Sequence, residues 1–195
     1  MVNSEIFNKA IQLFDEANSA DPNKELFEGK EYSKELLYAN RMTDRLNLFA
    51  PNSSEALKLT VRCQHICRWE IPRNSYEMNR TGYLKWRKDL KKFHANKAAS
   101  ILTKVGYNEE LINQVEFLLL KKKLKVNVET QTLEDVVCLV FLEFYFSKFS
   151  KKYAEEKLIE IIQKTWKKMS DEGHKAALKL SLPASALSLI TKALT

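Results

Sequence analysis

The sequence predicts an all-α fold, a single-domain helical bundle of about seven to nine helices. Apolar residues recur at every third or fourth position through most of the chain, which is the spacing of one helix face. Only four glycines and four prolines occur in 195 residues, too few for the turns of a many-stranded protein. This length suits one sizeable core, so residues 1–195 are expected to form one domain.

Composition limits the classes of protein and partner. Hydrophobic residues make up 45% and charged residues 29%, which is typical of a folded, soluble chain. No run approaches the roughly 20 apolar residues of a membrane helix, and the N-terminus has no basic region followed by an apolar one. We therefore expect a cytoplasmic protein without a membrane partner, whose three cysteines are buried thiols. The net charge of +7 permits an anionic partner without requiring one.

The first half of the chain is predicted to be helical with polar interruptions. A helix over residues 3–18 is followed by a polar connection at residues 21–29. Ser33 is expected to cap a second helix that ends near residue 49, and Ser53 or Ser54 to begin the third. The third helix has the most unusual sequence of the predicted helices.

That third helix contains the stretch Val61–Arg73, which begins as an apolar run and ends with polar and aromatic residues. His65, Arg68 and Trp69 follow the buried positions, and Pro72 ends the helix. Polar groups on a buried helix cost free energy unless something pairs with them. The stretch is therefore the first candidate for a functional site.

The second half is also predicted to be helical. Residues 72–82 are expected to form a long loop, followed by helices over 83–105 and 108–123. Thr132 is expected to cap a helix whose run over residues 136–142 is apolar all round, which is typical of a central helix. Three further helices within residues 153–194 are expected to pack on this core.

Two histidines and one carboxylate are candidate metal ligands. His65 falls at the edge of its helix's buried face, and His94 lies four residues from both Leu90 and Ala98. Asp135 lies near the start of the central helix. Such residues from three helices are the ingredients of a divalent-metal site in a bundle. The alternatives are hydrogen-bonded core histidines and an aspartate that caps its own helix.

Arginine and aromatic residues flank the predicted loop. Guanidinium groups suit phosphate oxygens, and aromatic rings can stack on a base. The alternative is that the arginines pair with nearby glutamates and the aromatic residues are core. The lysines between Lys121 and Lys125 end a helix, where a solvated cationic face is expected. The candidate ligand-binding residues are Arg62, Gln64, Arg68, Trp69, Arg73, Arg80, Trp86 and Arg87.

The order of these motifs resembles the HD-domain superfamily of metal-dependent phosphohydrolases. The resemblance covers roughly residues 33–146 and rests on His65, on His94 with the apolar run that follows it, and on Asp135. It implies one divalent transition metal ion (Mn, Fe, Co, Ni or Zn), held by His65, His94 and Asp135. It also implies that Glu134 orients or deprotonates the attacking water.

Two positions depart from the pattern of that superfamily. Ile66 stands where the superfamily has a metal-bridging aspartate, and Tyr38 stands near the position of its first histidine. The departures remove two of the four usual ligands. Any metal site must therefore be rebuilt, from His65, His94 and either Asp135 or Glu134, or it is absent.

A second resemblance covers nearly the whole chain. The segments 35–39, 64–73, 82–87 and 133–142 are similar to the domain-of-unknown-function family DUF4202, which carries no established activity. The sequence thus predicts either a divergent phosphohydrolase acting on a nucleotide or small phosphate ester, or a non-catalytic module that binds such a ligand. An accessory factor that binds RNA or another protein is a third, weaker hypothesis, because the lysines are scattered.

Overall fold

The computed structural model of the chain describes residues 4–194; the predictions for residues 1–3 and 195 lie outside the described residues. Most of the described chain is helical, with one short hairpin near the start. The elements are α1 (Ser4–Ser19), β1 (Lys24–Phe27), β2 (Lys30–Ser33), α2 (Lys34–Phe49), α3 (Glu55–Cys63), η1 (Arg68–Glu70), η2 (Arg73–Ser75), α4 (Arg80–Val105), α5 (Glu109–Leu119), α6 (Val128–Val140), η3 (Phe141–Tyr145), α7 (Phe146–Ser150), α8 (Glu155–Trp166), α9 (Asp171–Ala177) and α10 (Ala184–Leu194).

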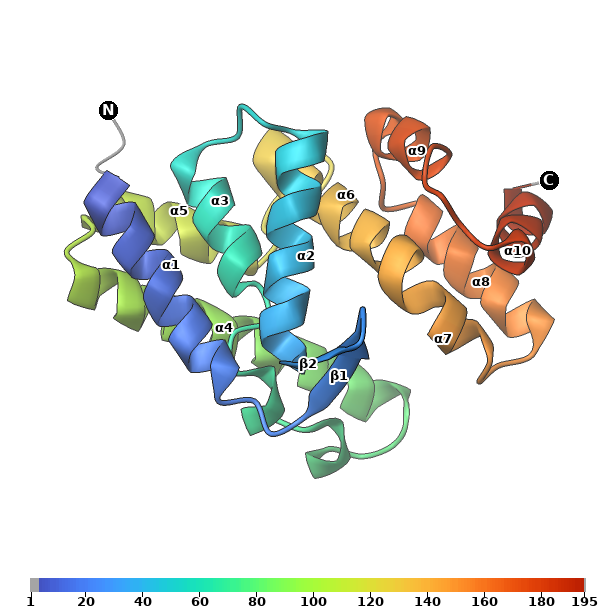
Figure 1. The fold of residues 1–195 in the computed structure, drawn as a ribbon, viewed down its shortest axis with the longest axis horizontal. Helices are drawn as coiled ribbons and strands as arrows, with labels where there is room; N and C mark the ends of the chain where they lie inside the picture. The colour runs from blue at the N-terminus through green and yellow to red at the C-terminus, as the bar shows by residue number, and fades with distance from the viewer. Residues whose placement is uncertain (1–3, 195) are drawn as a thin grey trace.

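The helices form one elongated bundle, which confirms the predicted all-α class (Figure 1). Helices α1 to α5 gather toward one end, and α8 to α10 gather at the other. Helix α6 connects the two ends, because it continues through the π-helical turn η3 into α7. If α6 and α7 are counted as one continuous helix, the ten α-helices of the described residues become nine, within the predicted range of about seven to nine helices.

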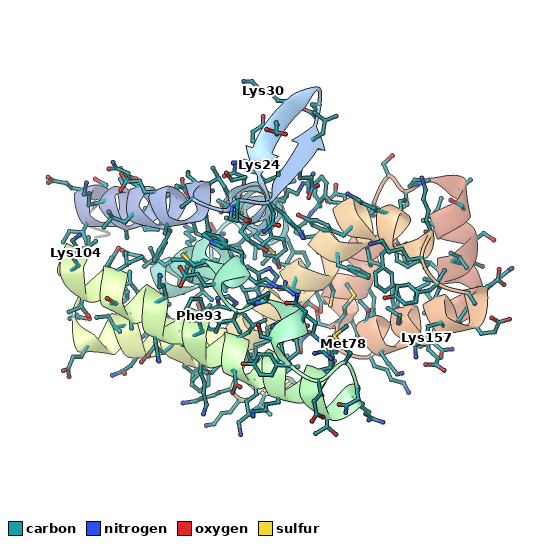
Figure 2. The ribbon with its side chains drawn as sticks, turned by 90° about the horizontal axis from the view of Figure 1, so that it is seen from below. Lys24, Lys30, Met78, Phe93, Lys104 and Lys157 are labelled. Atoms are coloured by element: carbon teal, nitrogen blue, oxygen red, sulfur yellow. The ribbon has the colours of Figure 1, made fainter. Side chains whose placement is uncertain are left out.

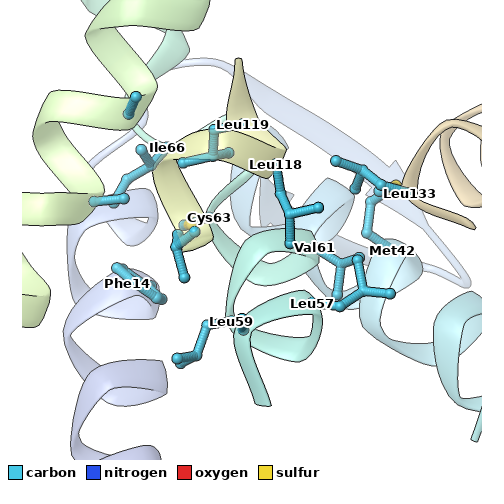
Figure 3. Close-up of a cluster of buried hydrophobic side chains, with 14 of the residues drawn as sticks. Phe14, Met42, Leu57, Leu59, Val61, Cys63, Ile66, Leu118, Leu119 and Leu133 are labelled. Atoms are coloured by element: carbon cyan, nitrogen blue, oxygen red, sulfur yellow. The ribbon is translucent and has the colours of Figure 1, made fainter. Parts of the chain in front are cut away.

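The larger core lies between α1, α2, α3, α5 and α6. Figure 3 shows apolar side chains from these helices meeting around α3, whose Leu59 and Val61 are fully buried. Ile66, just beyond the end of α3, is also fully buried and belongs to the same cluster. Burying an Ile or Leu side chain contributes about 1.5–3 kcal/mol, so this cluster fixes the position of the residues that follow α3.

A second core joins the C-terminal helices to the end of α6. Leu139 and Phe146 are fully buried there, together with Ile162 of α8 and Ile190 of α10. This cluster packs α8 and α10 against the end of α6 and against α7. All three cysteines are buried free thiols, as expected from their apolar surroundings.

The stretch after α1 is a β-hairpin, not the polar connection predicted for residues 21–29. Strands β1 and β2 pair in antiparallel fashion, and Figure 2 shows the hairpin standing away from the helices. Glu28 and Gly29 form its turn with φ values of 49° and 74°. Buried Arg41 holds its base, since the guanidinium donates to Glu25 Oε1 at 2.8 Å and lies 4.6 Å from the ring centroid of Phe27. These long-range contacts have no local sequence signal.

Two predicted helix caps have different outcomes. Ser54 caps α3 as expected, because its side chain accepts a hydrogen bond from the Leu57 amide. Ser33 precedes α2, but its hydroxyl donates to the Ser19 carbonyl instead of capping. The Glu35 amide at the start of α2 is bound by Asp21 Oδ2 at 3.0 Å.

The predicted start of the central helix was wrong. Helix α6 begins at Val128, and Asn127 caps it by accepting from the Thr130 amide at 2.9 Å. Thr132 lies inside the helix, where its hydroxyl donates to the Val128 carbonyl at 2.9 Å. Asparagine is as good a cap as threonine, so residue type alone did not distinguish the two positions.

The predicted loop at residues 72–82 is shorter and more ordered than expected. It contains the 3-10 turn η2, and α4 begins at Arg80, not at residue 83. Asn79 caps α4 by accepting from the Gly82 amide, and Gly106 ends it with a φ of 100°. The ending at Gly106 confirms the prediction from its freedom to adopt positive φ.

Candidate functional site

The chain reverses direction immediately after α3, and this turn builds the candidate site. Cys67 adopts a left-handed conformation with φ of 51°, and its amide is bound by Asn18 Oδ1 at 3.0 Å. The turn buries Ile66 in the core and leaves His65 and Arg68 half-buried. The Ile66 side chain therefore serves packing.

A small pocket lies between this turn, α4 and the end of α5. Its volume is about 30 Å³, which gives room for about two water molecules or one small oxyanion. Two wider hollows, of about 420 and 670 Å³, contain Glu110 but no lysine, arginine or histidine in their linings. The small pocket is lined by Gln64, His65, Arg68, Arg87, Leu90, Lys91, His94, Leu119 and Lys121.

His94 lies on the inward face of α4, as predicted, with 4% of its surface exposed. Its Nδ1 atom lies 2.8 Å from the Ile66 carbonyl oxygen. Because a carbonyl can only accept, Nδ1 carries the proton and Nε2 is an acceptor in the neutral ring. Nε2 is buried without a hydrogen-bond partner among residues 4–194. Burial, and then the proximity of His65, lower the pKa of His94 to about 3, so the ring is neutral near pH 7.

His65 sits between an acid, an arginine and a tyrosine. Its Nδ1 lies 3.4 Å from Glu35 Oε2, and its ring stacks on Tyr38 with centroids 4.2 Å apart. Arg68 Nη1 lies 3.2 Å from both ring nitrogens. Desolvation, followed by the charges of Arg68 and Arg87, holds the pKa of His65 well below its usual value. His65 is therefore a neutral polar group in a cationic environment.

Gln64 offers a hydrogen-bond donor to the pocket. The Tyr38 hydroxyl donates to Gln64 Oε1 at 2.6 Å, which fixes the amide orientation. The Gln64 amino group then has no hydrogen-bond acceptor within the part of the chain that the structure describes. It remains available to an oxygen atom of a ligand.

The cations of the pocket are positioned by aromatic residues. The Arg68 guanidinium lies 5.1 Å from the ring centroid of Trp86, whose Nε1 donates to the Ile71 carbonyl at 2.9 Å. Arg87 is exposed at the mouth and approaches the Tyr83 hydroxyl at 3.4 Å. Partial burial, and then the charges of Lys121 and Arg87, lower the pKa of the half-buried Lys91. The pocket thus concentrates positive charge.

Lys121 was expected in a solvated cluster, but it lies almost buried at the end of α5. Its ammonium pairs with Glu134, and the two side chains are 9% and 5% exposed. Lys168 approaches the same carboxylate at 3.7 Å. Burial alone would raise the pKa of Glu134, but the charge and hydrogen bond of Lys121 lower it. The predicted catalytic residue is thus a carboxylate held by two lysines.

Asp135 faces away from the two histidines and toward α9. Its carboxylate accepts from the Ser170 amide at 2.8 Å and from the Ser170 hydroxyl at 2.6 Å. Asp135 therefore does not cap its own helix, which was the alternative prediction, but binds Ser170 at the start of α9. Among residues 4–194, no group of three or more His, Cys, Asp or Glu side chains is arranged to hold a metal ion. The proposed set of His65, His94 and Asp135 therefore does not fit a metal centre in this arrangement.

Five of the eight predicted ligand-binding residues do not line the pocket: Arg62, Trp69, Arg73, Arg80 and Trp86. Arg62 forms a two-pronged ion pair with Asp15, with both contacts at 2.6 Å. Arg73 donates to backbone carbonyls of its own loop, including Glu77 at 2.6 Å. Arg80 is exposed in the first turn of α4, and Trp69 packs against the larger core.

Gln64, Arg68 and Arg87 do line the pocket, and Trp86 supports Arg68. The sequence prediction missed Lys91, although its spacing of four residues from Arg87 places both on one face of α4. It also missed Lys121, whose direction depends on a left-handed backbone with φ of 53°. No sequence signal indicated that conformation at a lysine.

Comparison with known proteins gives a family without an activity. The family described as Domain of unknown function (DUF4202) matches residues 8–190. No curated protein and no solved structure matches the chain. Within the described residues, no helix is both long enough and apolar enough to span a bilayer.

Proposed function

We propose a function for this chain, which belongs to the DUF4202 family. The family description gives no activity. The pocket between α3, α4 and α5 binds a small phosphorylated ligand. A nucleotide or another small phosphate ester fits this class. The proposal rests on the pocket alone and does not depend on the HD-domain resemblance, which stays a prediction.

One observation carries the proposal. Arg68, Arg87 and Lys91 converge on one pocket, and none of them forms an ion pair with an acidic side chain among residues 4–194. Partly desolvated like charges repel one another, so their convergence costs free energy unless an anion offsets it. Glu35 near Arg68 and Glu134 near Lys91 supply part of the counter-charge. A bound phosphate group would add negative charge inside the pocket itself.

The chemistry of the lining agrees with this ligand class. Guanidinium groups match the spacing of phosphate oxygens, and the stacking of Arg68 near Trp86 holds one of them before binding. The Gln64 amino group adds a neutral donor. The pocket volume of about 30 Å³ suits one phosphate group, and any larger part of the ligand would extend past Arg87 at the mouth.

Calorimetric titration with inorganic phosphate at constant ionic strength tests the proposal. Arg87→Gln is expected to weaken binding about fivefold to tenfold, because it removes one charge-assisted contact. Arg80→Gln is the matched control, since it removes the same charge from an exposed site on the same helix. Equal affinities for the wild type and both variants, or no measurable binding to the wild type, would contradict the proposal.

The divergent metal-dependent phosphohydrolase is the second candidate. It is favoured by the unpartnered Nε2 of His94, because metal-binding histidines commonly anchor their other ring nitrogen on a carbonyl. The cationic lining opposes it. Metal analysis of the native protein, with hydrolysis assays containing added Mn²⁺, Co²⁺ or Ni²⁺, tests this candidate, and His65→Ala is its control.

A further inference from the structure

We propose that His94 makes the pocket selective for an oxyanion that still carries a proton, so that hydrogen phosphate binds in preference to sulfate. This inference rests on the proposed function, since it concerns the same pocket. It assigns His94 a role in specificity, as an acceptor among donors.

First, the His94 ring has a fixed tautomer. The 2.8 Å contact between Nδ1 and the Ile66 carbonyl fixes the tautomer and directs the proton away from the pocket. The other nitrogen, Nε2, is buried and unpartnered on a ring that lines the pocket. A buried acceptor without a donor costs free energy, so a ligand that supplies the donor is favoured.

The second step is the contrast with the rest of the lining. Arg68, Arg87 and Lys91 are donors, and Gln64 also presents a donor because Tyr38 binds its amide oxygen. Neutral His65 has one acceptor nitrogen, but Arg68 Nη1 lies 3.2 Å from both of its ring nitrogens. Donors alone would bind any tetrahedral dianion of the right size. The lone pair of His94 lets the pocket distinguish between such dianions, because it attracts a P–OH group and repels an oxygen that has no proton.

The third step is the charge of the ring itself. A protonated His94 would be a donor on both nitrogens and would lose the selectivity. Burial and the neighbouring His65 and Arg68 disfavour this form and hold the pKa near 3. The acceptor therefore persists through the neutral pH range in which the anions are compared.

Phosphate and sulfate are a suitable pair because they differ little in size. Near pH 8 both carry two negative charges, but hydrogen phosphate retains one hydroxyl and sulfate retains none. A site that makes a hydrogen bond to that hydroxyl rejects the analogue without it, since the buried acceptor then stays unpaired. A phosphate monoester has a second pKa of about 6 and is a dianion without a P–OH near pH 8, so it would satisfy the same acceptor with a hydroxyl of its organic part.

Calorimetric titration of the wild-type protein with phosphate, sulfate, arsenate and selenate near pH 8 tests the inference. Phosphate and arsenate, which retain a proton, are expected to bind at least about tenfold more tightly than sulfate and selenate. Arsenate and selenate are larger than phosphate and sulfate. If the affinities follow protonation and not size, so that arsenate binds like phosphate and selenate like sulfate, the hydrogen-bond acceptor is the cause of the selectivity. This comparison needs no variant.

His94→Phe adds a second test, since phenylalanine keeps the ring and removes the acceptor. The variant is expected to bind sulfate more tightly than the wild type does, because the repelling lone pair is gone, and to lose the preference for phosphate. Phosphate and sulfate binding the wild type within about threefold of one another would overturn the inference and leave the proposed function standing. Binding of neither anion would overturn both.

Discussion

The Nδ1 atom of His94 lies 2.8 Å from the carbonyl oxygen of Ile66, the residue that follows His65. One turn of the chain after α3 therefore orients both histidines of the pocket. The Ile66 side chain enters the core, and its carbonyl fixes the tautomer of His94. Ile66 therefore contributes its side chain to the core and its carbonyl group to a hydrogen bond with a pocket histidine.

The two pocket histidines are expected to make the protein less stable in mild acid. Folding lowers the pKa of both rings from the unfolded value of about 6.5. The folded-state pKa of His94 is about 3, and that of His65 lies well below its usual range. The unfolded chain then binds more protons below pH 6.5, so stability is full above that pH and falls as the pH decreases toward 3. Each histidine contributes at most about 1.4 kcal/mol per pH unit.

Urea unfolding between pH 7.5 and 5 measures this effect. His94→Phe is expected to reduce the slope, because one of the two histidines is removed. A free energy of unfolding that stays constant over this range in the wild type would contradict the assignment of neutral, buried rings.

The ion pair of Lys121 with Glu134 is expected to be essential for stability. Lys121→Met leaves a carboxylate that is 5% exposed, with Lys168 at 3.7 Å as its remaining ion-pair partner among residues 4–194 and Arg87 farther away. Removing one partner of a buried pair typically costs about 3–5 kcal/mol, and Lys168 favours the lower end. Denaturant unfolding measures the loss.

The double variant Lys121→Met/Glu134→Leu is the matched control for this pair. It removes both charges and is expected to recover most of the lost stability. If the double variant is less stable than Lys121→Met alone, the pair does not act as a unit.

Gly173 is expected to tolerate no side chain. A Cβ atom there would lie 2.6 Å from Asp135 Oδ1 and would push the carboxylate from its contacts with Ser170. Gly173→Ala should lower the free energy of unfolding by about 1–3 kcal/mol. Lys175→Ala, on an exposed part of α9, is the control and should change it by less than about 0.5 kcal/mol. Equal effects would show that the contact between Asp135 and α9 is unimportant.

The cap of α6 can be assigned by two substitutions. Asn127→Ala removes the acceptor for the Thr130 amide and should cost about 1 kcal/mol. Thr132→Ala removes a hydroxyl that bonds only within the helix, and should cost less than about 0.5 kcal/mol. Thermal unfolding ranks the two variants, and the reverse order would place the helix start at Thr132.

Helical periodicity was sufficient to predict the all-α class and the inward direction of His94, because Leu90 and Ala98 lie one turn away on each side of it. It also placed Asp135 inward. It could not say that Asp135 meets Ser170 of α9, since direction on one helix does not identify the neighbouring helix.

The hairpin and Lys121 could not be predicted for a different reason. Strands of four residues have too short a pattern to distinguish them from a polar connection, and contacts with Arg41 hold them. Lys121 points into the protein because of a left-handed backbone that lysine rarely adopts. Both features depend on tertiary contacts more than on local sequence.

A crystal structure of the protein grown with phosphate tests the central claim most directly. Ligand density is expected within hydrogen-bond distance of Arg68, Lys91 and the Gln64 amino group, beside the ring of His94. A pocket that stays without phosphate at saturating concentration, or density bound elsewhere on the surface, would contradict the account.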